Sequence, residues 1–93
     1  MSKKIGNFIY MKSTAKDKKL MVLSPKGKLI HFGQYPHEHF FDKTGLLDKK
    51  LNHKDKVRRV SYLQRTSNIQ RKDGTATKND PESANYHARK ILW

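Results

Sequence analysis

The sequence predicts a small single-domain α+β fold in which a β-hairpin packs with two helices. Two β-prone apolar runs, residues 19–24 and 28–33, flank the turn sequence Ser-Pro-Lys-Gly, which is typical of a hairpin. Two later segments, residues 52–65 and 80–93, place apolar side chains at helical spacing beside capping residues. The 93-residue length suits one domain, and an apolar share of 34% indicates a thin core.

Residues 1–17 are predicted to form a basic N-terminal arm, which leaves residues 18–93 as the α+β domain. The aromatic stretch at residues 6–11 fits either a short strand or a docking arm, and the polar residues after it read as a loop. The basic start lacks a long apolar region and a small-residue cleavage site, so we do not expect a signal peptide.

The hairpin is the best-supported local prediction. Its turn at residues 24–27 uses proline to preset the backbone angle and glycine to allow a positive φ. Because strand side chains alternate between faces, the buried face is predicted to carry Leu20, Val22, Ile30 and Phe32. His31 then points away from the core, and we interpret it as a half-exposed strand histidine.

Residues 34–51 show no clean period but hold too many apolar side chains for a solvated loop. We expect a packed irregular segment, with a short strand or helical turn. The first helix is predicted over residues 52–65, with Asn52 as its N-cap and Asp55 at the capping-box position. The spacing also lets Asp55 pair with Arg58 or Arg59.

Residues 66–79 are polar and are predicted to form a mobile loop with a turn at Asp73-Gly74. The second helix is predicted over residues 80–93, capped by Asp80, with an apolar stripe of Ala84, Ala88 and Ile91. Trp93 either completes the core or anchors an interface, and the shortage of apolar volume favours the core.

The net charge of +13 falls mainly in two blocks. Residues 1–28 hold eight lysines against Asp17, and residues 49–72 hold nine basic residues against Asp55. Such a surface attracts nucleic acid, an anionic membrane or an acidic protein. The residues expected to bind a polyanion or an acidic partner are Lys16, Lys18, Lys19, Lys49, Lys50, Arg58, Arg59 and Arg65.

The sequence contains few features that are typical of a catalytic or metal-binding site. There is no cysteine, the eight acids are scattered, and no phosphate-binding loop or nucleophile motif is present. His37 and His39 make the only tight histidine cluster, which is weak evidence for a metal, and His53 with Asp55 fits helix capping better than catalysis. We therefore expect no enzyme activity, no metal, no cofactor and no membrane span.

Three motifs follow one another within residues 18–93: a Gly-Lys-x-Ile-His-Phe-Gly strand from Gly27, a His-x-Asp-x-x-Arg-Arg-x-x-Tyr helix from His53, and a closing Leu-Trp. Together they resemble a family of small basic proteins encoded by large nucleocytoplasmic DNA viruses. The family helix continues into an Arg-His pair and a Trp-rich stretch, which do not follow Arg65 here. The resemblance implies a viral origin and a small hairpin-plus-helices fold, and no particular activity.

Two functions are consistent with these features. The first is a non-enzymatic virion structural protein, a minor capsid or cement component that contacts other virion proteins, the major capsid protein first among them. It would reside in the virion, and in the host cytoplasm before assembly. The alternative is a sequence-independent nucleic-acid-binding protein that contacts the phosphates of viral DNA or RNA and neutralises or packages the genome.

Overall fold

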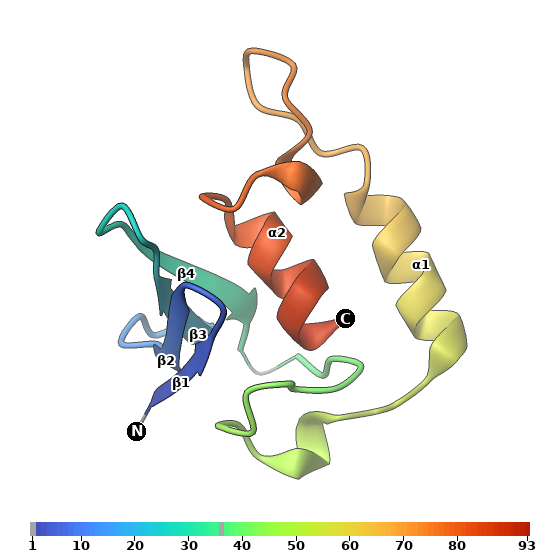
Figure 1. Cartoon of the computed structure of the whole chain (residues 1–93). Helices are drawn as coiled ribbons and strands as arrows, with labels where there is room; N and C mark the ends of the chain where they lie inside the picture. Colours follow the sequence, from blue (N-terminus) through green and yellow to red (C-terminus); the bar gives the residue numbers. More distant parts are fainter. Residues whose placement is uncertain (1, 36) are drawn as a thin grey trace.

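A computed structural model describes residues 2–35 and 37–93 as an antiparallel sheet with helices on one side (Figure 1). The strands lie side by side in chain order: β1 (Ser2–Ile5), β2 (Phe8–Lys12), β3 (Lys18–Leu23) and β4 (Leu29–Gln34). The helical elements are η1 (Lys49–Leu51), α1 (Lys56–Thr66), η2 (Thr77–Asn79), α2 (Ala84–His87) and its π-helical continuation η3 (Ala88–Leu92). The predicted α+β class is confirmed.

The β3–β4 hairpin forms as the sequence predicts. The turn closes where the Gly27 amide donates to the Ser24 carbonyl oxygen at 2.9 Å. The four side chains expected on the buried face are at most 6% exposed: Leu20, Val22, Ile30 and Phe32. His31 lies on the opposite face, half-buried, where its Nδ1 is 2.7 Å from the Ser13 hydroxyl.

The N-terminal segment is a second hairpin rather than an extended arm. β1 and β2 pair across a two-residue turn in which Gly6 takes a φ of 60°. Tyr10 of β2 is fully buried, and its hydroxyl is 2.9 Å from His87 Nδ1 on α2. Because Tyr10 packs under the helix, β2 contributes to the domain core and widens the sheet to four strands.

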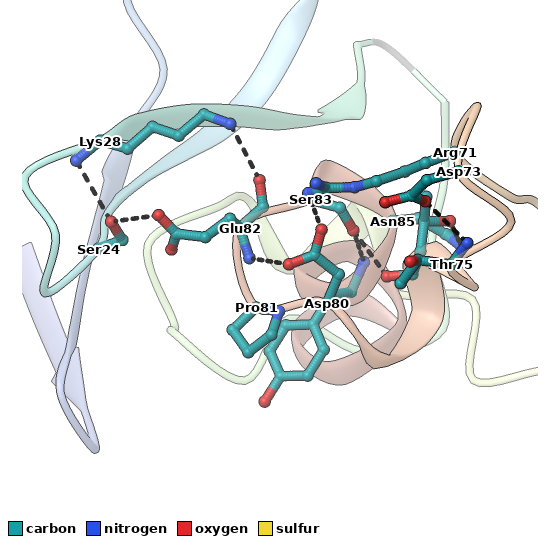
Figure 2. A network of polar contacts seen from close by, with 12 residues as sticks. Ser24, Lys28, Arg71, Asp73, Thr75, Asp80, Pro81, Glu82, Ser83 and Asn85 are labelled. Atoms are coloured by element: carbon teal, nitrogen blue, oxygen red, sulfur yellow. Dashed lines mark hydrogen bonds and ion pairs between the residues drawn. The ribbon is translucent and has the colours of Figure 1, made fainter.

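The second helix begins later than predicted. Ser83 is the N-cap of α2, and its hydroxyl accepts a hydrogen bond from the Tyr86 amide at 3.2 Å. Asp80 instead forms an ion pair with Arg71 and accepts from the Glu82 amide at 3.0 Å, as Figure 2 shows. The predicted stripe is therefore buried only from Ala88 onward, and the helix covers the sheet with His87, Ala88, Ile91 and Leu92.

The segment between β4 and α1 is irregular and packed, as expected, and contains the short helix η1. Its main chain closes the end of η3, because the Phe41 amide donates to the Leu92 oxygen and the Lys43 amide to the Ile91 oxygen, both at 3.1 Å. Lys43 Nζ adds a bond of 2.6 Å to the Lys90 oxygen. This cation complements the negative end of a helix dipole.

Helix α1 begins at Lys56 because Asp55, not Asn52, is its N-cap. The Asp55 carboxylate accepts from the Val57 and Arg58 amides. The Asn52 side-chain oxygen is used elsewhere, by the Asp42 amide at 2.9 Å and by a ring nitrogen of His39.

Helix α1 lies beyond α2, on the side away from the sheet (Figure 1). Thr66 is its only buried residue, and Val57 is 76% exposed. Arg89 holds its last turn by donating to the Leu63 oxygen and the Thr66 hydroxyl, each at 2.6 Å. The link between α1 and the rest of the domain is thus made by a few side chains.

Residues 66–79 form a small turn-closed loop. The Gly74 amide donates to the Arg71 oxygen at 3.0 Å with Gly74 at a φ of 89°, which confirms the predicted Asp73-Gly74 turn. Gln70 and Ala76 pair across its base. Mobility of this loop stays a prediction.

The second face of the sheet is not covered by α2. Met11 pairs with Met21 across β2 and β3, and Met21 pairs with His31 across β3 and β4. These side chains are half-buried, and Leu29 beside them is 46% exposed. This apolar surface, called the open sheet face below, lies opposite the core.

Candidate polyanion-binding surface

Nearly all the carboxylates are held by bonds inside the protein. Asp42, Asp48, Asp55, Asp73 and Asp80 accept from backbone amides, Glu38 accepts from Arg58, and Glu82 accepts from the Ser24 hydroxyl. Only three ion pairs form among the described residues, those of Lys50, Arg58 and Arg71. Most of the 21 basic side chains therefore have no carboxylate partner there.

The predicted polyanion-binding residues do not form one patch. Lys16 lies in the β2–β3 loop, Lys18 begins β3, and Lys49 and Lys50 lie in η1. The three arginines lie on α1: Arg58, Arg59 and Arg65. A groove of about 620 Å³ brings together Lys18, Lys19, Arg58 and Arg65, whereas Lys16, Lys49, Lys50 and Arg59 lie outside it.

Lys19 lines this groove, but its ammonium is already hydrogen-bonded inside the protein. It is 5% exposed, and its Nζ binds the His37 oxygen at 2.5 Å and His39 Nδ1 at 2.9 Å. Burial lowers the pKa of its ammonium to about 8, although Asp42 acts in the opposite direction. An amine enclosed in this way cannot reach a phosphate. In this structure Lys19 is therefore not available to bind a polyanion, in contrast to the prediction.

The expected pairing of Asp55 with Arg58 or Arg59 does not form, because Asp55 caps α1. Arg58 pairs with Glu38 at 3.1 Å. Arg59 donates from Nε to the main-chain oxygen of Trp93 at 2.6 Å and lies over the Phe40 ring. Arg59 thus fastens α1 to η3, and it is not a free cation.

The groove that contains Lys18, Arg58 and Arg65 is called the α1 groove below. One wall is α1, and the other consists of the end of β4 and the face of α2 and η3. Tyr62 and Trp93 are among its aromatic residues, and their rings stack with centroids 4.1 Å apart and planes 8° from parallel. Burial raises the pKa of the Tyr62 hydroxyl, while Arg65 and Arg89 lower it.

A second hollow of about 490 Å³ lies between α1 and the irregular segment. Its apolar members include Phe41 and Val60, which are 42% and 51% exposed. Lys43, Lys56 and Arg59 also line it. Desolvation lowers the pKa of Lys43, and the neighbouring cations Arg59 and Lys90 lower it further.

The histidines occupy separate structural positions. His37 is exposed, whereas His39 is fully buried with both ring nitrogens hydrogen-bonded. His53 accepts from the Asp55 amide at 2.9 Å, so this pair orders the start of α1. Residues 2–35 and 37–93 contain no group of three metal-ligating side chains. That His31, His37 and His39 bind no metal stays a prediction, which elemental analysis tests.

Sequence reasoning missed the stacked pair of Tyr62 and Trp93. The sequence did point to both residues as candidates, because aromatic side chains beside a run of arginines are typical of nucleic-acid-binding surfaces. Their contact depends on how η3 packs against α1, and no local pattern shows that.

Comparison with protein-family models, with curated proteins and with solved structures found no match to this chain. In the part of the chain that the structure describes, none of the helices has the length and apolar character needed to cross a bilayer.

Proposed function

We propose that the protein is a non-enzymatic binding protein that attaches to nucleic-acid phosphates without reading the base sequence. The observation that carries this proposal is the internal use of the carboxylates, which leaves most of the basic side chains to solvent. Neutralising phosphates releases their condensed counterions and supplies the free energy of binding. In a virus, such a protein would neutralise or package the genome.

Indifference to sequence follows from how the cations are distributed. Lys16 lies in the β2–β3 loop and Lys18 at the start of β3, Lys49 and Lys50 lie in η1, and Arg65 lies on α1. Contacts of this kind position a protein on the phosphate backbone but carry no base information. The sequence also contains no helix-turn-helix or zinc-finger motif that would supply base readout.

Fluorescence anisotropy with labelled oligonucleotides tests the proposal. Two duplexes of unrelated sequence should bind equally, and the affinity should fall linearly on a log–log plot between about 50 and 200 mM salt. The variant Lys49→Gln should weaken both complexes and reduce the salt slope by about one unit. Strong preference for one sequence, or absence of binding at low salt, would contradict the proposal.

A second candidate is the virion structural role, in which the protein contacts a larger capsid protein. The hollow beside Phe41 and Val60 favours it, because exposed apolar groups next to basic side chains such as Lys56 suit a protein partner with an acidic rim. The placement in a virion rests on the resemblance to viral proteins.

Fractionation of purified particles separates the two candidates. Recovery of the protein with the shell proteins would support the capsid role. This recovery should be lost in Val60→Asp and kept in the remote variant Lys78→Gln. Recovery with the nucleoprotein core would support genome binding, and absence from particles would contradict a virion location.

A further inference from the structure

We infer that the α1 groove binds one strand of single-stranded nucleic acid, with a base stacked on the Arg65 guanidinium and a phosphate at Lys18. The inference rests on the proposed function and adds the form of nucleic acid that the protein prefers. It comes from three observations: a column of planar groups, a cation on the opposite wall, and the absence of a free acid between them.

The column consists of Arg65, Tyr62 and Trp93. The Tyr62 and Trp93 rings lie nearly parallel at 4.1 Å, and the Arg65 guanidinium carbon lies 5.5 Å from the Tyr62 centroid. His53 packs against Trp93 at 5.1 Å. The protein therefore covers much of the two aromatic rings itself, and the exposed end of the column is Arg65.

An arginine held over an aromatic ring is a prepared surface for a base. Its guanidinium is planar and always charged, so bases stack on it much as they stack on an aromatic side chain. The contact with Tyr62 holds the guanidinium over the ring before the ligand arrives. A lysine at position 65 would keep the charge but lose the plane.

The opposite wall offers a phosphate site and polar groups. Lys18 is exposed at the start of β3 and makes no ion pair with a described residue. Gln34 and Asn85 also line this wall, Ser61 lines the α1 wall, and Asn85 binds the Thr66 oxygen at 3.0 Å. The groove's only acid, Glu38, is engaged by Arg58 at 3.1 Å. A phosphate entering here therefore meets unpaired positive charge.

A single strand fits this arrangement better than a duplex. The volume of about 620 Å³ lies within the range of about 300–1,000 Å³ that is usual for enclosed ligands, and it suits a short stretch of strand. Bases in a duplex stack on one another and present only their edges in the grooves, so they offer no free face to Arg65. Unpaired bases do offer that face.

Anisotropy titrations with oligo(dT) and with a hairpin duplex of equal phosphate number test the inference. Wild type should bind oligo(dT) more tightly. Arg65→Lys should weaken oligo(dT) binding roughly tenfold, as expected for loss of one base stack, and weaken duplex binding much less, because the charge at position 65 is kept. Tyr62→Leu, which removes the support of the guanidinium plane, should weaken oligo(dT) binding in the same selective way.

Two controls keep the outcomes separate. Lys49→Gln, outside the groove, should weaken strand and duplex alike, and thermal melting should confirm that each variant folds. Equal losses for strand and duplex in Arg65→Lys, or equal wild-type affinities, would overturn the inference and leave the proposed function standing. Failure to bind either nucleic acid would remove the proposed function itself. Displacement of oligo(dT) by polyglutamate at equal charge concentration would also overturn the inference, in favour of an acidic protein.

Discussion

Phe32 and Phe41 are the same residue type in different surroundings. Phe32 is 1% exposed in the core of the sheet, and Phe41 is 42% exposed beside η3. We expect Phe32→Ala to lower the free energy of unfolding by about 3–5 kcal/mol, because it removes a large buried side chain and leaves a cavity. The matched change Phe41→Ala should cost about 1 kcal/mol or less. Urea denaturation measures both, and equal losses would contradict the placement of Phe32.

Two histidines, His39 and His87, are fully buried, and each accepts a hydrogen bond at Nδ1, which only the neutral imidazole can do. Burial raises the pKa of the Tyr10 hydroxyl, which donates to His87 Nδ1 and leaves Nε2–H to donate to the Pro81 oxygen at 2.7 Å. Lys19 likewise donates to His39 Nδ1, and His39 Nε2–H donates to Asn52. Burial is the main cause that lowers the pKa of both imidazoles.

Stability should therefore fall in mild acid. The unfolded histidines begin to bind protons near a pKa of about 6.5, while the folded ones bind them only at lower pH. Each buried histidine then lowers the free energy of unfolding by about 1.4 kcal/mol per pH unit below about pH 6.5, until its folded pKa is reached. Urea denaturation at about pH 7.5 and about pH 5 measures the change. His31→Gln, on the open sheet face, should leave that change intact, and unchanged stability at the lower pH would refute the prediction.

At the scale of elements, α1 is attached to the rest of the domain by few contacts. It contributes one buried residue, Thr66, and it is held by the Tyr62–Trp93 stack and by the hydrogen bonds of Arg59, Arg89 and Asn85. Opening of such an element costs less free energy than unfolding the sheet. Amide hydrogen exchange should therefore be faster in α1 than in β3, and Arg89→Ala should speed exchange in α1 alone. Equal protection of α1 and β3 would show that the helix unfolds only with the whole domain.

Elements were predictable from the sequence where their determinants are local. The β3–β4 hairpin follows from alternation and from a turn whose residues are adjacent in the chain. The starts of both helices were misplaced because the signal depends on distant partners. The Asn52 side chain is hydrogen-bonded to Asp42 and His39, and Asp80 forms an ion pair with Arg71. When a possible capping residue is bound to a partner elsewhere, the helix begins after the next residue that can cap it.

At the scale of the whole molecule, the α1 groove was beyond sequence reasoning. Its two walls place Lys18 opposite Arg65, residues that become neighbours only after α2 and η3 have packed on the sheet. Composition did predict that a cationic surface exists. It did not show which lysine would be buried, because the enclosure of Lys19 requires the irregular segment to fold over β3.

The net charge of +13 also affects folding itself. Like charges repel more strongly in the compact state than in the expanded chain, and added salt screens that repulsion. We expect the melting temperature to rise between about 0.01 and 0.15 M salt. A soluble polyanion such as heparin should raise it further at low salt, because it binds the folded state. A melting temperature that falls on both additions would contradict this account.

The open sheet face gives the protein a chemical sensitivity that is separate from its charge. Met11 and Met21 are cross-strand partners there, half-buried and outside the core. Oxidants convert such thioethers to polar sulfoxides. Because the core lies on the opposite side of the strands, the fold should survive this oxidation, while the surface that a partner would meet on this face changes from soft and apolar to polar. Aged preparations could thus keep their melting temperature and yet lose any contact made through that face.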